Sequence, residues 1–257
     1  MPSTRCRRFG PFTVVLTAAA AALSASPAAL AGQAPPMPED EHVTSRPIHR
    51  AVRTAGPILI DGVLDEESWA SAPVVDEFVQ VDPEEGQPAS ERTEARILYD
   101  TEALYIGVRL YDRGRVQSRL GRRDMGLLDS DWLGVVIDSY HDHRTGFVFD
   151  VNPAGVQRDA IKAVTGQGSE GDDNSWDAVW EVKTTVDDGG WTAEYRIPFS
   201  QIRFSKDAEQ VWGILLERLI GRRGEYSTTT FVPRTEQGGI PTYGHLLGVE
   251  DIAQGNT

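Results

Sequence analysis

Two short acidic segments carry oxygen ligands of the kind that a calcium ion takes. Residues 129–131 read Asp-Ser-Asp, and residues 172–174 read Asp-Asp-Asn. Calcium binds about six to eight oxygens from carboxylates, carbonyls and water, but neither segment has the spacing of an EF-hand loop. Acidic loops are also often simply solvated. We predict calcium at either segment, with solvation as the alternative. The candidate ligands are Asp129 and Asp131 in the first segment and Asp172 and Asp173 in the second.

A second candidate metal-binding sequence is His141-Asp142-His143, which lies in a polar turn. Imidazole nitrogens bind zinc and related metals, although histidines in a turn more commonly face water. No catalytic signature accompanies them, since the sequence lacks Gly-x-Ser-x-Gly, a phosphate-cradling loop and His-Glu-x-x-His. A glycosidase needs two opposed carboxylates, and Asp129, Asp131 and Glu217 are merely available acids in an acidic chain. We expect no catalysis by this chain alone.

The first 31 residues have the three parts of a secretory signal peptide. Three arginines precede an apolar run over residues 12–23, and Ala29-Leu30-Ala31 supplies small residues before a cleavage point. The apolar run is too short for a stable membrane anchor. The chain's one cysteine, Cys6, lies in this segment, so the mature chain would have no disulfide and no cysteine-bound zinc. We predict export to the periplasm, the outer membrane or the medium.

Charge and composition define the remainder of the chain. The formal net charge is −14, and it becomes −17 without residues 1–31. Nucleic acids and anionic membranes attract positive potential, so we expect neither as a partner. Residues 32–50 are rich in proline and acids and predict a polar linker. Residues 51–252 suffice for one domain with a filled core, and residues 253–257 form a polar tail.

Period-two alternation of apolar residues predicts β-hairpins. Apolar side chains alternate over 133–137 and again over 147–151, with a polar turn at 140–146 between them. Side chains in a strand point alternately to opposite faces, so each run presents one apolar face to a core. The same alternation recurs in two further pairs of segments, 93–99 with 104–110 and 178–183 with 191–197.

Other segments complete the predicted fold. Residues 211–216 are apolar on both faces and read as an interior strand. Residues 156–163 read as an edge strand, 166–174 as a flexible acidic loop and 58–60 as a short strand. Residues 65–69 read as one helical turn, and no longer helix is expected. This pattern predicts an all-β antiparallel sandwich with one or two short helical turns.

Six ordered signatures extend across residues 51–252. They are Ile60-Asp61-Gly62-x-Leu64-Asp65-Glu66-x-x-Trp69, Ile97-x-Tyr99-Asp100-x-Glu102-x-Leu104-Tyr105-Ile106, Asp131-x-Leu133-x-Val135-x-Ile137-Asp138, Gly190-Trp191-x-x-Glu194-x-x-Ile197-Pro198, Trp212-Gly213 and Tyr243-Gly244-x-Leu246. In this order they resemble family 9 carbohydrate-binding modules, of the type at the N-terminus of bacterial secreted and outer-membrane proteins. The resemblance implies a calcium-containing, jelly-roll-like β-sandwich that binds the ends of sugar chains.

The chain departs from this family at its sugar-stacking positions. In well-understood members two tryptophans sandwich the sugar, and the matching positions here fall at about Leu128 and within residues 237–240, where no aromatic residue stands. Trp132 and Trp176 lie beside the acidic loops and are the candidate replacements, with ordinary packing as the alternative. Candidate hydroxyl-binding cations are Arg109, Arg122, Arg123 and Arg218.

The resemblance implies one main function and one alternative. The main expectation is a secreted, non-catalytic carbohydrate-binding module that assists O-glycosyl hydrolases in polysaccharide breakdown, with a hydrolase domain as its usual partner. The alternative is a periplasmic interaction domain that precedes an outer-membrane barrel, present here as a truncated or free-standing copy. Both expectations place recognition at the ends of the strands.

Overall fold

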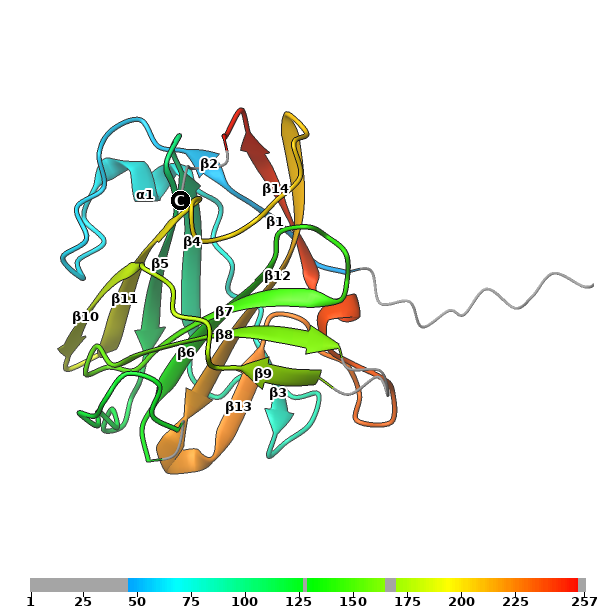
Figure 1. The fold of residues 1–257 in the computed structure, drawn as a ribbon. Coiled ribbons are helices and arrows are strands. Elements are labelled where there is room, and N and C mark those ends of the chain that lie inside the picture. The colour runs from blue at the N-terminus through cyan, green and yellow to red at the C-terminus, as the bar shows by residue number, and fades with distance from the viewer. Residues whose placement is uncertain (1–45, 127–128, 165–169, 254–257) are drawn as a thin grey trace, which may run out of the picture. The chain divides into compact units, whose positions relative to one another are not determined.

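The computed structural model describes residues 46–126, 129–164 and 170–253. The predicted signal peptide, most of the predicted linker and residues 254–257 lie outside these ranges. Within them the chain forms two β-sheets and three short helical segments (Figure 1). Among the described residues no helix is long and apolar enough to cross a membrane.

The larger sheet has nine strands. Hydrogen bonds join them in the order β1 (Ile48–Arg50), β14 (Gly244–Glu250), β12 (Glu209–Ile220), β6 (Trp132–Asp138), β7 (Thr145–Val151), β8 (Gln157–Val164) and β9 (Glu170–Asp173). A branch adds β13 (Glu225–Thr228), which pairs with β12 and with β3 (Val79–Asp82). In Figure 1, β7, β8 and β9 lie side by side, as their antiparallel pairing requires.

The smaller sheet has five strands in the order β10 (Glu181–Asp187), β11 (Gly190–Pro198), β5 (Ala103–Tyr111), β4 (Thr93–Tyr99) and β2 (Val52–Arg53). The helical segments are α1 (Glu67–Ser71), η1 (Gly221–Arg223) and η2 (Ile240–Thr242). Neighbouring strands are antiparallel except for β1 with β14 and β2 with β4, which are parallel. The all-β sandwich predicted from the sequence is therefore confirmed.

The core lies between the two sheets, where the alternating residues of both meet. The predicted hairpins are present, since Val135 pairs with Phe149 and Ile97 with Ile106. Aromatic rings fill the space: Trp180 stacks on Tyr195 with ring centroids 5.6 Å apart and an interplanar angle of 7°. Three tryptophans are buried in this core, namely Trp180, Trp191 and Trp212.

The outer face of the five-stranded sheet is covered by the segment that contains α1. Trp69 crosses this face above Gly107, where an added Cβ would lie 3.0 Å from the indole ring. The indole Nε1 donates to Glu66 at 2.9 Å, which fixes the ring across the strand. The helical turn predicted at residues 65–69 thus forms because the tryptophan packs against a strand that leaves room for it.

Three local expectations were wrong. Residues 58–60 are irregular, because they cover the smaller sheet without pairing to a strand. β8 is not an edge strand, since β9 pairs with it inside the segment expected to be a loop. β1 lies within the expected linker, where it pairs with β14 over three residues. Both β1 and β9 are short and largely exposed, so neither has an alternating apolar pattern that a sequence reading can detect.

Candidate functional site

The outer face of the nine-stranded sheet carries acidic side chains at its centre. Gly134 of β6 pairs with Asp150 of β7 on one side and with Glu217 of β12 on the other. A Cβ added to Gly134 would lie 2.7 Å from Asp150 Oδ1 and 2.8 Å from Glu217 Oε1. The absence of a side chain at Gly134 therefore leaves room for two carboxylates to approach each other above the strand.

Asp150 is an unusual carboxylate because one of its oxygens is buried without a partner. The residue is 2% exposed, and its Oδ2 accepts from Arg158 at 2.5 Å while Oδ1 has no hydrogen bond. Burial first, and then the charge of Glu217, raise the pKa of Asp150. An unmet buried acceptor costs about 1–3 kcal/mol. Such groups gather at functional sites, where a ligand can supply the missing donor.

Neighbouring polar groups fix the two carboxylates in place. Arg158 of β8 also donates to Asp172 of β9, so that one guanidinium joins β7, β8 and β9. The Tyr226 hydroxyl donates to Glu217 Oε2 at 2.5 Å. Burial and the charge of Glu217 raise the pKa of Tyr226 well above its usual value, so the phenol keeps its proton at neutral pH. These contacts hold the two carboxylates and the Tyr226 hydroxyl in fixed orientations.

A cavity of about 220 Å³ adjoins these groups. Its floor includes Glu217, Tyr226 and Lys162, and one rim comes from the loop around Gly238 and Gly239. Hydroxyl groups complete the polar lining, and they belong to Thr228, Thr230, Thr242 and Tyr243. A cavity lined by carboxylates, an ammonium and several hydroxyls suits a small neutral ligand with many hydroxyl groups.

The loop that forms this rim is held down by both polar and apolar contacts. The backbone N–H of Ile240 donates to Glu170 Oε1 at 2.6 Å, which ties η2 to β9. Below η2 a small apolar cluster separates the rim from the strands, and it contains Val136, Val148, Ala160, Leu215, Ile240 and Tyr243. The position of the cavity mouth is therefore set by packing on the outer face of the sheet.

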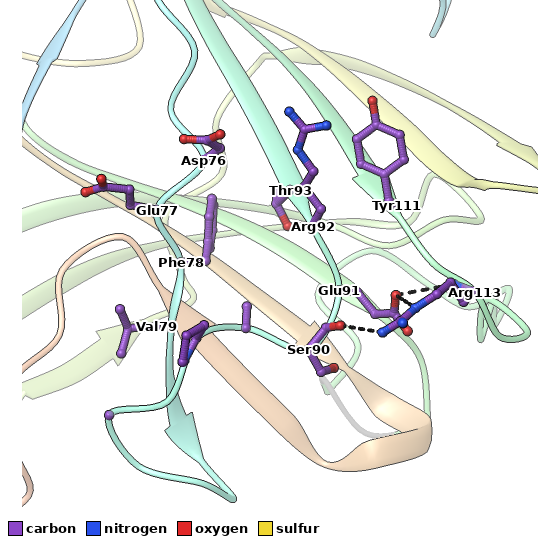
Figure 2. A pocket seen from close by; sticks show the side chains of 13 residues that line it. Asp76, Glu77, Phe78, Val79, Ser90, Glu91, Arg92, Thr93, Tyr111 and Arg113 are labelled. Carbon is purple, nitrogen blue, oxygen red and sulfur yellow. Dashed lines mark hydrogen bonds and ion pairs between the residues drawn. The ribbon is translucent and has the colours of Figure 1, made fainter.

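A second and larger cavity, about 820 Å³, lies beside the segment that precedes β3. Figure 2 shows Phe78 within it, with Arg92 and Tyr111 on the side away from Asp76 and Glu77. Phe78 is 4% exposed, so its ring offers little open surface. Its lining combines five charged side chains with apolar and small residues. We place the candidate site at the smaller cavity because Glu217 of the acidic pair lines it.

The predicted stacking tryptophans are not open platforms in this structure. Trp132 is 2% exposed, so its ring has no free face, and its Nε1 is buried without a partner. Trp132 lies two residues before Gly134, so both residues face outward from β6. Its ring therefore borders the carboxylates of Asp150 and Glu217. Trp176 is half-buried and packs against Phe147 and Phe149 at ring-centroid distances of 5.2 and 5.7 Å. A sugar-stacking role for Trp176 stays a prediction.

The predicted arginines lie apart from one another. Arg109 is on the five-stranded sheet, where it forms a two-bond ion pair with Asp187 at 2.7 and 2.8 Å. Arg122 is in an exposed loop, and neighbouring Arg123 binds Asp159. Arg218 is buried and donates to backbone carbonyls of the other sheet, so it is not available to a sugar hydroxyl. The structure does not bring these arginines together in one site.

The predicted calcium ligands already have other partners. Asp129 pairs with Arg119, and Asp131 accepts from the backbone N–H groups of Gln117 and Gly221. Asp172 is bound by Arg158, and Asp173 accepts from Ser175. The described residues contain no group of three or more histidines, cysteines or acids that is arranged to hold a metal ion. Calcium binding at either segment stays a prediction.

The sequence reading missed Asp150 and Tyr226, and it named Glu217 only as an available acid. The signal was present in the alternation, because Gly134 and Asp150 occupy the outward positions of a hairpin whose inward positions are apolar. Pairing the hairpin through its turn places these two residues opposite each other. Polar residues at outward positions of a hairpin usually face solvent, whereas Asp150 on this face is buried.

Comparison with known proteins gives a family and a fold. Residues 60–220 match the family model described as "Carbohydrate family 9 binding domain-like". Among proteins of curated function, none matches this sequence significantly.

Solved structures with similar folds include a family 9 carbohydrate-binding module from Caldicellulosiruptor kristjanssonii. Its complex with cellotriose has a TM-score of 0.54 at 15% identity, covering 77% of this chain and 92% of that one. Its glucose complex has a TM-score of 0.52 at 14% identity, covering 80% and 97%. A proposed carbohydrate-binding protein from Bacteroides uniformis has a TM-score of 0.59 at 11% identity, covering 79% and 99%. At these identities the likeness establishes the fold.

Proposed function

The chain belongs to the carbohydrate family 9 binding domain-like family, and from that premise we propose that it binds the end of a sugar chain at the cavity beside Glu217. The observation that carries the proposal is a cavity lined by Glu217, Lys162, Tyr226 and further hydroxyl groups. Sugar recognition needs several fixed hydrogen-bonding groups that face one small volume. Glu217, Tyr226 and Lys162 meet that requirement.

The size of the cavity favours a terminal sugar over a long chain. Sites for drug-sized ligands have volumes of about 300–1,000 Å³, whereas this cavity has about 220 Å³. The two similar Caldicellulosiruptor structures hold cellotriose and glucose. We therefore propose glucose-ended oligosaccharides as the first ligands to test.

The biological role follows from the same family and from the N-terminal sequence. Residues 1–31 have the pattern of a signal peptide, which supports a role outside the cytoplasm. In that setting we propose that the chain is a non-catalytic accessory to enzymes that break down polysaccharides. Its contribution would be to hold those enzymes near sugar chain ends.

Replacing Glu217 by glutamine is expected to weaken cellotriose binding at least about tenfold. A hydrogen bond to a charged group contributes about 1.5–3 kcal/mol, and glutamine keeps the shape while removing the charge. Folding should be retained, since the change also removes repulsion with Asp150. Isothermal titration calorimetry of cellotriose and of glucose provides the measurement, with Glu181→Gln on exposed β10 as the matched control.

A second variant decides between the two cavities. Arg92 lines the larger cavity, and Arg92→Ala should leave cellotriose affinity unchanged if the sugar binds beside Glu217. The reverse pattern, with a loss for Arg92→Ala and none for Glu217→Gln, would move the site to the groove shown in Figure 2. No binding of any oligosaccharide on a glycan array would remove the proposed function altogether.

A further inference from the structure

We propose that the imidazoles of His141 and His245 bind a divalent transition-metal ion such as Zn²⁺, Ni²⁺ or Cu²⁺. The two residues are far apart in the sequence but meet on the outer face of the nine-stranded sheet. His141 lies in the turn between β6 and β7, and His245 lies on β14. Gly213 of β12 pairs with both Asp138 and His245, which brings the end of β6 level with β14.

The distance between the two rings is the distance that a shared metal ion requires. His141 Nε2 and His245 Nδ1 are 3.1 Å apart. Histidine nitrogens bind zinc at about 2.0–2.1 Å, so two nitrogens on one ion stand roughly 3–3.4 Å apart in tetrahedral or square geometry. One of the two nitrogens now donates a hydrogen bond to the other. When a metal ion binds, the donor ring carries its proton on its other nitrogen, so that both ligand nitrogens present a lone pair to the ion.

A third histidine stands within reach. The His143 ring centroid is 4.4 Å from that of His141, in an edge-to-face arrangement. Its Nδ1 lies 3.7 Å from Oδ2 of the buried Asp138, and a carboxylate behind a histidine is a common orienting partner in metal sites. Among the described residues no three possible ligands are already arranged around one metal position. His143 must therefore rotate to become the third ligand.

The backbone holds the two turn histidines in an unfavourable conformation. His141 has φ 52° and His143 has φ 58°, the left-handed region that residues other than glycine seldom adopt. Two such residues in one turn persist only where surrounding contacts impose them. Here the Asp138 carboxylate accepts the backbone N–H groups of Asp142 and His143 at 3.1 and 2.9 Å. The turn is therefore built to keep its imidazoles in place.

The charge state of the cluster also suits a metal. The neighbouring polar groups include two carboxylates, because Asp138 accepts the N–H of Asp142 and Asp142 accepts those of Arg144 and Thr145. Asp138 and Asp142 supply the negative charge that faces the turn. None of the three histidines is among the residues that line the proposed sugar cavity.

Zn²⁺ titrated into the full chain, purified without a histidine tag, tests the proposal by isothermal titration calorimetry. We expect one ion per chain and at least tenfold weaker binding in His141→Gln and in His245→Gln. Cu²⁺ electron paramagnetic resonance should show at least two coordinated nitrogens in the unsubstituted chain and fewer in either variant. His143→Gln should weaken Zn²⁺ binding by a smaller factor.

The matched control is His49→Gln, because His49 is buried on β1 and its Nε2 has no partner. This variant should bind Zn²⁺ as the unsubstituted chain does. Circular dichroism checks that every variant is folded. Affinity weaker than about 1 mM, or affinity unchanged in both His141→Gln and His245→Gln, would overturn the proposal. Zn²⁺ should not change the affinity for cellotriose, so the sugar-binding proposal is tested independently of the metal-binding proposal.

Discussion

Replacing Arg218 by alanine is expected to lower the free energy of unfolding by about 3–5 kcal/mol, the usual cost of removing one partner from a buried charge network. Arg218 lies on β12 and reaches the other sheet, where its guanidinium donates to the carbonyls of Arg92 and Tyr111 and to Thr93 Oγ1 at 2.7–3.0 Å. Burial lowers its pKa to about 10, against the opposing charges of Asp112, Asp131, Glu91 and Glu225.

The loss has two physical sources. The alanine variant leaves carbonyls at the ends of β4 and β5 without a donor in a water-free space, and it leaves the surrounding carboxylates without their central cation. Urea unfolding followed by tryptophan fluorescence measures the change. Arg122→Ala is the control, since Arg122 is exposed. This substitution should lower the free energy of unfolding by no more than about 0.5 kcal/mol. Equal effects of the two substitutions would refute this account of Arg218.

Replacing Glu194 by glutamine is expected to change how stability depends on pH. Glu194 lies buried on the outer face of the five-stranded sheet, and its Oε2 accepts the N–H groups of Asp61 and Gly62 at 3.0 and 2.9 Å. Burial first, and then the charges of Glu66 and Asp61, raise its pKa to about 7 from 4.5. Because the folded chain holds this proton more tightly than the unfolded chain, the group stabilises the fold below pH 4.5, and this contribution is lost as the pH rises to about 7.

The effect is measured as the difference in the free energy of unfolding between the Glu194→Gln variant and the unsubstituted chain. As the pH rises from 4.5 to 8, the free energy of unfolding of the glutamine variant should increase by up to about 3 kcal/mol relative to that of the unsubstituted chain. The increase amounts to about 1.4 kcal/mol per pH unit. Glutamine preserves the acceptor for both backbone groups, so the loop at residues 61–62 should stay in place. Urea unfolding across this range measures the difference, and Glu181→Gln on exposed β10 should show none. A constant difference at all pH values would show that Glu194 titrates normally.

Much of the fold was predictable because the inner faces of the strands follow a strict alternation. The hairpin of β6 and β7 and that of β4 and β5 each present apolar residues at every second position, and burial between two sheets requires that pattern. β12 was predictable for a related reason, since both of its faces are covered and it is apolar on both. In these segments the alternation that is typical of a strand and the packing between the two sheets require apolar residues at the same positions.

The site was not predictable for the opposite reason. Arg218 was predicted as a candidate cation for sugar hydroxyls, and a charged residue seldom lies in a core. Only the three-dimensional fold shows the carbonyls that accept its hydrogen bonds. The acidic pair depends on Gly134 lying between two strands, one of which is distant in the sequence. β9 is exposed throughout and exists because β8 offers it a free edge. Such features arise from contacts between segments and leave no local pattern.

The position of β14 has a consequence for how this chain matures. This strand inserts between β1 and β12, and it contributes Leu246 and Val249 to the core. The large sheet is thus incomplete until residue 250 has left the ribosome, and its earliest strand must wait for its last one before it can pair. Contacts that join such distant segments form slowly. For the export that residues 1–31 predict, this delay would keep the chain extended for longer.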